Sequence, residues 1–351
     1  MIRNIFNCIS IHNGGGIVYL SMMHSHIDKK GNLILLDYRA RNNIKPFLYA
    51  RIKYYKKNIL RNILVFNERL KYSTIFKKYL KESGKKEFLK EYYLNGIPPF
   101  FRFSNSRNKV YVLFQNRNLF SYLNYFNPDL FFRYKFVIYH LLHSIIINLF
   151  LKNTDTIIVQ TKTMGKILSS AKPKNNILIK DRIWKNIKLE SYLKCINQSE
   201  KNKEYYCINM LKKISEFNQL FFYPASLEPH KNHKILFKAF TKIEKMNFKK
   251  LKLIVTLEPK QVPFKNRSNK NIIFIGHQSS KVINEVYRLV DFLIFPSLNE
   301  SLGLPLIEAN LYKLPIIASN LEYVYDVCEP SLTFDPYSEE DIFDKILESS
   351  N

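Results

Sequence analysis

Cysteine and glycine are both scarce in this chain of 351 residues. Its 4 cysteines are scattered, and no two of them have the C-x-x-C spacing or another spacing typical of metal ligands. This pattern argues against a disulfide framework and predicts reduced, mostly buried thiols in a cytoplasmic protein. Because the chain has only 9 glycines, any cluster of glycines is informative. The cysteines are Cys8, Cys195, Cys207 and Cys328.

A signal peptide and a long apolar run are also lacking. The residues up to His12 have no basic start, no long apolar run and no small-residue cleavage site. The most apolar stretch, Phe136–Leu151, contains polar residues such as His140 and His143, and it is shorter than the ~20 residues of a membrane-spanning helix. We therefore expect a buried core helix at this stretch and no transmembrane segment.

The whole chain has a formal net charge of +26, and its acidic residues are few in the first half. Residues 1–180 hold 31 Lys+Arg and 8 Asp+Glu, whereas residues 181–351 hold 24 and 21. A Lys/Asn/Ile-rich coding bias explains part of this excess, but such a bias acts on both halves alike. We therefore expect the N-terminal half to face an anionic partner: nucleic acid, an anionic membrane surface or a diphosphate-bearing acceptor.

Short apolar runs alternate with helical patterns through most of the chain, and its length suits two domains. Several of these runs are continuously apolar, as expected for parallel strands that are buried on both faces. Strands that alternate with helices predict doubly wound α/β sheets. The expected strands are Ile5–Ile11, Leu33–Tyr38, Ile63–Phe66, Val110–Phe114, Thr156–Gln160, Leu220–Tyr223, Leu251–Thr256, Ile272–Ile275, Phe292–Phe295 and Ile316–Ala318.

A polar, charged stretch without a convincing strand separates the two series of strands. We place an N-terminal Rossmann-like domain at residues 1–185, a linker region at 186–216 and a C-terminal Rossmann-like domain at 217–351. Two such domains in tandem predict a cleft between the carboxyl ends of two sheets, where ligands usually bind.

Three consecutive glycines, Gly14, Gly15 and Gly16, follow the first expected strand. They allow the backbone to approach a ligand closely, and the N-terminus of the following helix favours an anion. A tight turn between strand and helix is the alternative interpretation. Asn116 follows another expected strand and is a candidate contact of the acceptor, although ordinary loop polarity explains it equally well.

Lys231 lies in a polar loop directly after the first expected strand of the second domain. From the carboxyl edge of the sheet, a Lys can meet diphosphate oxygens as a point charge. Two histidines, His12 and His230, are further candidates for sugar or phosphate contacts, although a lone His is more often structural.

The segment Asp291–Asn320 is the most informative of the sequence. A buried strand leads to Glu300 and a glycine-containing turn, and a helix that carries Glu308 follows. The N–H groups of the turn are placed to hold sugar or phosphate oxygens of a donor. The E-x₇-E spacing alone arises roughly once by chance in a chain with 19 Glu, so its context carries the signal.

These segments resemble the retaining, GT-B-fold glycosyltransferases of family 4, in the subgroup that builds surface polysaccharides such as O-antigen and capsule. The resemblance is best over Leu220–Glu348 and implies two Rossmann-like doubly wound domains that face each other across a cleft. It is carried by YPAS…PHKNH, FIGHQS, FPSLNESLGLPLIEA and FDPYSEEDI.

By this resemblance, Lys231 and Glu300 are the catalytic residues, directed at the donor diphosphate and the donor sugar. Glu308 is directed at the ribose of the nucleotide. Ser226 stands where the family has an Arg, Ser301 replaces a common glycine, and family members continue beyond the helix expected at residues 339–348. The remaining implied donor-binding residues are Gly276, His277, Ser301, Leu302, Gly303 and Leu304.

The resemblance also implies transfer with retention of the anomeric configuration, from a nucleotide-sugar donor to a glycan or polyprenyl-diphosphate-linked acceptor. We expect no metal and no cofactor, because no Asp-x-Asp pair stands in a suitable loop and Lys231 with helix N-termini can take up the leaving-group charge. We expect a cytoplasmic protein, peripheral on the inner face of the membrane through Lys and Arg. The candidate membrane contacts are Arg51, Lys53, Lys56, Lys57, Lys77, Lys78, Lys85 and Lys86.

Two alternatives remain open from the sequence. One is a catalytically degenerate GT-B-like binding protein, which Ser226 and the position of the chain's end favour. The other is a nucleic-acid-binding protein, since basic residues mixed with aromatics suit phosphates and stacked bases. The second alternative leaves the C-terminal domain unexplained, and no nucleic-acid motif is recognisable, so we expect no nucleic acid as partner.

Overall fold

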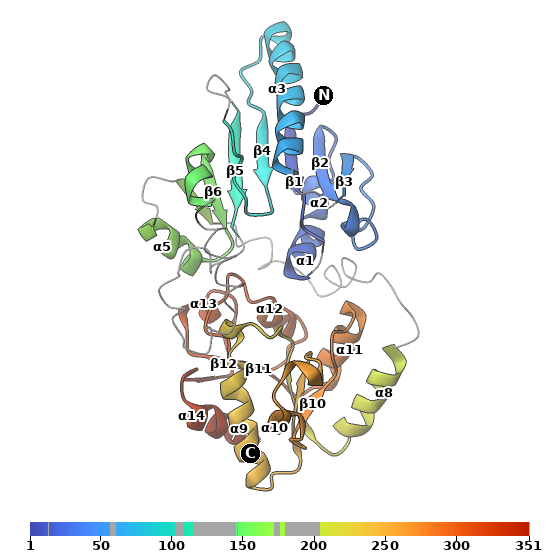
Figure 1. Cartoon of the computed structure of the whole chain (residues 1–351), viewed down its shortest axis with the longest axis vertical. Helices are drawn as coiled ribbons and strands as arrows, with labels where there is room; N and C mark the ends of the chain where they lie inside the picture. The colour runs from blue at the N-terminus through green and yellow to red at the C-terminus, as the bar shows by residue number, and fades with distance from the viewer. Residues whose placement is uncertain are drawn as a thin grey trace. The chain divides into compact units, whose positions relative to one another are not determined.

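The computed structural model describes residues 1–12, 14–56, 61–102, 108–114, 145, 147–171, 176–179 and 204–350. The chain divides into two compact units, Met1–Ile187 and Lys188–Asn351 (Figure 1). Each unit contains its own sheet of parallel strands with helices between them, so the expected α/β class is confirmed.

The sheet of the first unit has seven strands within the described residues, in the order β3-β2-β1-β4-β5-β6-β7. The chain starts at a central strand, fills one side of the sheet and then the other, which is the doubly wound pattern. Its order reverses between β1 and β4. The strands are β1 (Asn4–Cys8), β2 (Asn32–Asp37), β3 (Arg51–Tyr55), β4 (Lys90–Tyr93), β5 (Lys109–Leu113), β6 (Thr156–Val159) and β7 (Asn176–Ile179).

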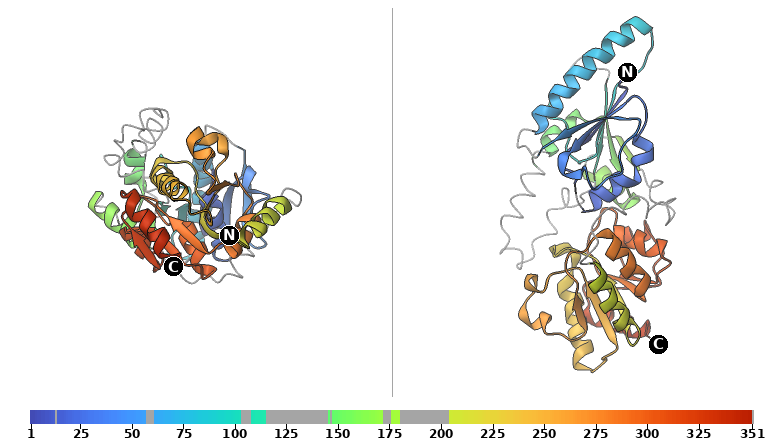
Figure 2. Two further views of the ribbon diagram at one scale, coloured as in Figure 1. Left: turned by 90° about the horizontal axis from the view of Figure 1, so that it is seen from below. Right: turned by 90° about the vertical axis from the view of Figure 1, so that its right-hand side faces the viewer.

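Helices cover both faces of this sheet, and the residues of β2 show why its apolar run is continuous. Leu33 and Leu35 belong to a core beneath α3 and α5, whereas Ile34 and Leu36 belong to a second core beneath α1 and α2. Figure 2 shows α3 and α1 on opposite sides of the sheet. Successive side chains of a strand point to opposite faces, so a strand covered on both must be apolar throughout. The helices are α1 (Gly14–Met22), α2 (His24–Ile27), α3 (Arg61–Ser83) and α5 (Lys162–Ala171).

The sheet of the second unit has six strands within the described residues, in the order β10-β9-β8-β11-β12-β13. Phe221 of β8 packs against Phe240 of α9, and the next residue, Phe222, packs against Tyr287 of α11. This sheet is therefore also covered on both faces. The strands are β8 (Gln219–Tyr223), β9 (Leu251–Val255), β10 (Ile272–Phe274), β11 (Phe292–Phe295), β12 (Ile316–Ser319) and β13 (Leu332–Phe334). The helices are α8 (Glu204–Ser215), α9 (His233–Lys245), α10 (Phe264–Arg267), α11 (Ser280–Leu289), α12 (Leu304–Leu311), α13 (Glu322–Tyr325) and α14 (Glu339–Glu348).

Part of the range expected to be linker is structured. Residues 186–203 lie outside the described residues, but α8 occupies most of the rest and packs against α11. Leu211 and Cys207 of α8 are buried in the core of the second unit. A helix with one apolar face and a polar outer face has a polar composition, which is why this range resembled a linker.

The expected strand at Ile63–Phe66 is wrong, because these residues lie in α3. A short apolar run rich in β-branched residues does not distinguish a strand from a buried helix segment. Burial along α3 has helical spacing, with Val65, Arg69, Ser73 and Phe76 all facing inward. Helical spacing over the longer window is the signal that identifies α3.

No helix in the described part of the chain is long and apolar enough to cross a membrane. Most of the apolar stretch Phe136–Leu151 lies outside the described residues. Cys8 and Cys207 are buried free thiols, as expected, whereas Cys195 lies outside the described residues.

Candidate functional site

The order of strands in the second sheet reverses between β8 and β11, which are neighbours. Ligands of doubly wound sheets bind beyond the carboxyl ends of the strands at such a reversal. The loop after β8 contains a single 3₁₀ turn, Pro229–Lys231, and the segment after β11 contains Glu300. The two residues singled out as catalytic therefore lie on the two loops that flank this position.

Lys231 and Glu300 meet in the structure. The Nζ atom of Lys231 lies 2.6 Å from Oε1 of Glu300, although the residues are 69 positions apart in sequence. Their side chains keep 17% and 10% of their surface exposed, so the pair is partly buried but open to solvent. A cation in this position can interact with an anionic ligand at the edge of the sheet.

Buried hydrogen bonds lie behind this ion pair. The hydroxyl of Tyr223 donates to the carbonyl of Lys231 over 2.7 Å and lies 2.9 Å from Oγ of Ser297. The hydroxyl of Tyr323 donates to the carbonyl of Ser297 over 2.6 Å. Burial first, and then the nearby carboxylate of Glu300, raise the pKa of Tyr223 well above its usual value, so its hydroxyl keeps its proton.

The turn Ser301-Leu302-Gly303 leads into α12, as expected. Gly303 is the N-cap of this helix and has a left-handed backbone, with φ 66° and ψ 58°. A Cβ atom at this position would also lie 3.1 Å from Cδ1 of Leu306. Glycine is the residue that adopts this conformation without strain. The first helical residue is Leu304.

Glu308 lies one turn further along α12 and is held by a neighbouring helix. The hydroxyl of Tyr287 on α11 donates to Oε2 of Glu308 over 2.9 Å. The ring of Tyr287 stacks on Tyr312, with centroids 5.4 Å apart. The carboxylate of Glu308 therefore has a fixed orientation next to the loop that carries Glu300.

Gly276 and His277 follow β10, which is two strands away from β8 in the sheet. Gly276 has a left-handed φ of 69°, its N–H donates to the carbonyl of Leu257 over 3.2 Å, and a Cβ atom there would collide with the carboxylate of Glu258. His277 is exposed. Both residues lie at the same carboxyl edge of the sheet as Lys231.

Ser226 is exposed at the start of the β8 loop, and its carbonyl accepts a hydrogen bond from Nε2 of His233 over 3.0 Å. Burial lowers the pKa of His233 to about 4, so the ring is neutral at pH 7. His230 is buried, with Nε2 lying 3.5 Å from Oε2 of Glu228. The burial of His230 fits a structural role better than a ligand contact.

In the first unit, Gly14, Gly15 and Gly16 follow β1 and are the first residues of α1, so they lie within the helix that was expected to follow them. Asn116 lies outside the described residues. His12 precedes the glycines, and its Nδ1 lies 3.1 Å from the carbonyl of Ser10.

Sequence reasoning missed the pair Asp37–Arg39, which lies at the carboxyl edge of the first sheet, at the end of β2. Arg39 donates two side-chain hydrogen bonds to Asp37, over 2.9 and 2.8 Å, and the N–H of Ser10 donates to the same carboxylate over 3.2 Å. Burial alone would raise the pKa of Asp37, but the hydrogen bonds from Arg39 outweigh it and hold the pKa below its usual value. An acidic residue directly after the apolar run Leu33–Leu36 was the available signal.

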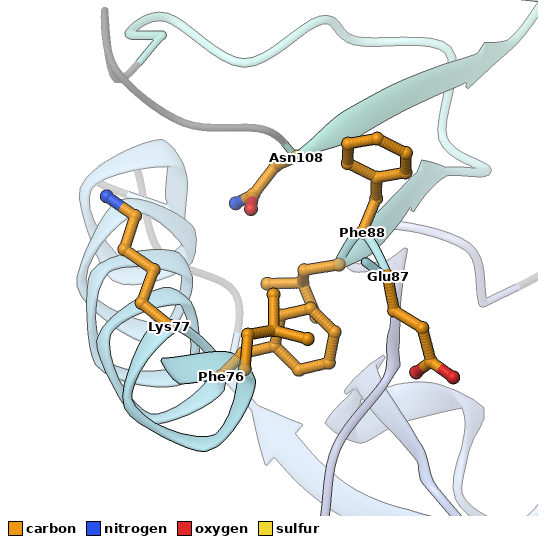
Figure 3. A pocket seen from close by; sticks show the side chains of 7 residues that line it. Phe76, Lys77, Glu87, Phe88 and Asn108 are labelled. Carbon is orange, nitrogen blue, oxygen red and sulfur yellow. The ribbon is translucent and has the colours of Figure 1, made fainter. Parts of the chain in front are cut away.

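A cavity of about 210 Å³ lies elsewhere in the first unit (Figure 3). It is bounded by α3 and by the segments that precede β4 and β5, so it lies at the amino ends of these strands. None of the site residues expected from the sequence lines it. Its lining residues are Phe76, Lys77, Leu80, Glu87, Phe88, Leu89 and Asn108. Within the described residues, no group of three or more His, Cys, Asp or Glu side chains is placed to hold a metal ion.

Residues 211–350 match the protein family described as glycosyl transferases group 1. This match lies within the second unit. No match is found among curated protein sequences.

Solved structures resemble the whole chain. Alr3699/HepE of Anabaena, crystallised with UDP and glucose, has 12% identity and a TM-score of 0.61, covering 100% of this chain and 90% of that chain. WaaG, a glycosyltransferase involved in lipopolysaccharide biosynthesis, has 13% identity and a TM-score of 0.57, covering 99% and 90%. The N-terminal domain of trehalose-6-phosphate phosphatase from Candida albicans has 9% identity and a TM-score of 0.64, covering 99% and 89%. Identities this low show the fold alone, and that fold is GT-B.

Proposed function

We propose that this chain is a glycosyltransferase that takes a sugar from a nucleotide-sugar donor. The observation that carries the proposal is the pairing of Lys231 with Glu300 at the strand-order reversal of a glycosyl transferases group 1 domain. A cation and a carboxylate at this place match the two parts of such a donor, the diphosphate and the sugar hydroxyls. The structure of HepE with UDP-glucose supports the class of donor.

In this proposal Lys231 stabilises the leaving diphosphate. Negative charge accumulates on the diphosphate as its bond to the sugar breaks, and a preorganised ammonium group lowers the energy of that transition state. The reaction then needs no divalent ion. Glu300 accepts hydrogen bonds from the sugar hydroxyls and Glu308 from the ribose hydroxyls, because an ionised carboxylate is an acceptor only. Gly276 and His277 lie by the nucleotide base.

The stereochemical part of the proposal is retention of the anomeric configuration. The acceptor attacks from the face that the diphosphate leaves, and a phosphate oxygen of the leaving group takes the acceptor's proton. The acceptor is a glycan or a polyprenyl-diphosphate-linked glycan in surface polysaccharide synthesis. It lies against the first unit, near Gly14, Gly15 and Gly16, and Asn116 is a further candidate contact.

A cytoplasmic protein held at the inner face of the membrane completes the proposal. The excess of Lys and Arg in residues 1–180 supports it, and exposed lysines of α3 and the following loop are available for anionic lipid. Each contributes roughly 1 kcal/mol near an anionic surface, and salt screens the attraction. Binding to vesicles with phosphatidylglycerol should therefore weaken as salt rises. Binding that ignores salt would contradict this part. The exposed lysines are Lys71, Lys77, Lys78, Lys81, Lys85 and Lys86.

The test of the proposed function is the release of nucleoside diphosphate from a panel of UDP-, GDP-, ADP- and dTDP-sugars. We expect one donor to be cleaved, slowly with water alone and faster with a suitable acceptor. Cleavage should fall by roughly 100-fold in Lys231→Ala and be kept in Lys238→Ala. Lys238 is the matched control because it pairs with Glu339 over 2.8 Å on the exposed surface of the same unit.

Ser226 favours a second candidate, a binding protein of the same fold without catalysis. Its exposed side chain stands where the resemblance places an Arg that binds the diphosphate. A catalytically degenerate protein would bind one nucleotide sugar of the panel and release no nucleoside diphosphate. Ser226→Arg should increase diphosphate affinity in both candidates, but it would not restore turnover if Lys231 and Glu300 no longer act.

A further inference from the structure

Lys231 and Glu300 are brought together by a set of hydrogen bonds between their two loops. On the β8 loop, three consecutive residues take part: His230, Lys231 and Asn232. On the segment after β11, three consecutive residues also take part: Pro296, Ser297 and Leu298. The two loops are therefore joined residue by residue just before Glu300.

The first connection runs through buried hydroxyls. Tyr223 has one hydroxyl hydrogen and donates it to the carbonyl of Lys231, so the bond with Ser297 must be donated by Ser297. The order of donation is thus Ser297 to Tyr223 to the Lys231 carbonyl. Tyr223 and Ser297 are both fully buried, so no water replaces a bond that is lost.

The second connection runs through Asn232, which has a left-handed backbone with φ 58° and ψ 30°. Its amide nitrogen donates to the carbonyls of Pro296, over 3.1 Å, and Pro336, over 2.8 Å. Both amide hydrogens are therefore used. A backbone bond from the N–H of Leu298 to the carbonyl of His230, 2.8 Å long, lies beside them.

We propose that Tyr223 and Asn232 are positioning residues of the donor site, which act by fixing the backbone of Lys231 against the loop of Glu300. A Lys side chain has four flexible carbon–carbon bonds, so the place of its ammonium depends on a fixed backbone. Displacing a site by about 1 Å lowers reaction rates markedly. This inference rests on the proposed function, because it assigns Lys231 to the donor diphosphate.

The proposal predicts an effect on the binding of nucleotides that carry a second phosphate. Lys231 interacts with the diphosphate, so a displaced Lys231 weakens the binding of a nucleoside diphosphate and leaves that of the monophosphate unchanged. A general loss of stability would affect both nucleotides alike. The ratio of the two dissociation constants therefore reports on Lys231 without requiring an acceptor.

The experiment is calorimetric titration of UDP, GDP, ADP and dTDP, each compared with its monophosphate, into the full chain. The variants are Tyr223→Phe, which removes one hydroxyl, and Asn232→Gly, which keeps the left-handed backbone and removes the amide. The controls are Tyr93→Phe, a buried hydroxyl of the first unit, and Asn247→Gly, another asparagine with positive φ at the far end of α9. Should Tyr223→Phe fail to fold, Ser297→Ala carries the same expectation.

We expect the wild type to bind one nucleoside diphosphate more tightly than its monophosphate. Each variant should reduce this ratio of dissociation constants about tenfold, as one displaced charged contact would cause. The controls should keep it. In a Lys231→Ala background, Tyr223→Phe should have no further effect, because a positioning residue acts through the residue that it positions. Two results would overturn this inference and leave the proposed function standing. One is a preference for the diphosphate over the monophosphate that is unchanged in Tyr223→Phe. The other is a loss of this preference in the double variant that equals the sum of the losses in Tyr223→Phe and Lys231→Ala. A wild type that prefers no diphosphate would overturn the proposed function and this inference with it.

Discussion

An ion pair joins distant segments in each unit, and the two pairs differ in burial and in position. In the first unit Arg69 of α3 binds Glu91 of β4, and their side chains are only 2% and 1% exposed. Asn108 also donates to Glu91 over 2.9 Å, and Arg69 donates to the carbonyl of Phe101 over 2.6 Å. In the second unit, Lys231 and Glu300 keep 17% and 10% of their surface exposed at the carboxyl edge of the sheet.

From this difference we interpret the first pair as structural and the second as part of the proposed donor site. Arg69 and Glu91 are enclosed by protein donors and acceptors, so their interaction contributes to the folded state and to nothing outside it. Lys231 and Glu300 are open to solvent, so an anionic ligand can replace Glu300 as the partner of Lys231. Loss of the first pair should therefore reduce stability, and loss of the second should reduce binding and turnover.

The largest expected effect is on stability and comes from Glu91→Ala. Removing one partner of a buried ion pair leaves the other charge uncompensated, which costs about 3–5 kcal/mol. Urea unfolding followed by circular dichroism measures this loss. Glu87→Ala is the control, because Glu87 is 39% exposed and 3.8 Å from Arg3, and its loss should be small. Equal losses in the two variants would contradict the structural role of Glu91.

The second effect is on turnover and comes from Lys231→Ala. Removing a preorganised group that stabilises developing charge lowers the rate by roughly 100-fold, or about 3 kcal/mol. The free energy of unfolding should fall less than in Glu91→Ala, because Lys231 and Glu300 keep more of their surface exposed than Arg69 and Glu91. Donor cleavage and urea unfolding are measured on Lys231→Ala and on the control Lys238→Ala. A large loss of stability with unchanged turnover would reverse the two assignments.

The third effect is a pH dependence due to His233. Its pKa is about 4 in the folded chain and 6.5 when unfolded, so between these values the unfolded state binds more protons. Above about pH 6.5 His233 is neutral in both the folded and the unfolded chain, so its titration does not reduce the free energy of unfolding there. The free energy of unfolding declines by up to about 3 kcal/mol as the pH falls to about 4. Unfolding measured at several pH values should show a shallower decline in His233→Gln, whereas the exposed control His277→Gln should match the wild type. Identical slopes in all three proteins would contradict the effect of burial.

The smallest effect distinguishes two glycines with the same backbone conformation. Gly303 and Gly84 have φ values of 66° and 67°, so alanine at either position costs about 1–2 kcal/mol. Only Gly303 begins the helix that carries Glu308. We therefore expect both variants to lose stability, with a somewhat larger loss in Gly303→Ala because its Cβ would also lie 3.1 Å from Cδ1 of Leu306, and Gly303→Ala alone to lose nucleotide affinity in the calorimetric titration. Unchanged affinity in Gly303→Ala would remove the α12 turn from the donor site.

Much of the fold could be predicted because its strands are buried on both faces. Runs such as Leu33–Leu36 and Phe292–Phe295 have no polar residue, and this alone indicates parallel sheets. The strands β3 and β4, RIKYY and KEYY, escaped prediction because charged and aromatic residues replace the apolar run. These two strands form by pairing with β2, β1 and β5, and no short window of sequence contains both a strand and its partners.

The sequence predicted which loops form the candidate site, but not the hydrogen bonds between these loops. Lys231 and Glu300 were identified from their positions after expected strands and from resemblance, and the structure brings them together. The hydrogen bonds of Tyr223 with Ser297 and of Asn232 with Pro296 could not be predicted, because these partners are 74 and 64 positions apart. Such contacts depend on the adjacency of β8 and β11, and that adjacency follows from the three-dimensional fold.

The central claim is that the carboxyl edge of the second unit binds a nucleotide sugar. Its most direct test is the change in melting temperature that a panel of nucleoside diphosphates and nucleotide sugars causes in the wild type and in Glu308→Ala. We predict that one nucleotide raises the melting temperature of the wild type and that Glu308→Ala reduces this rise. A panel in which no nucleotide stabilises the wild type would contradict the claim.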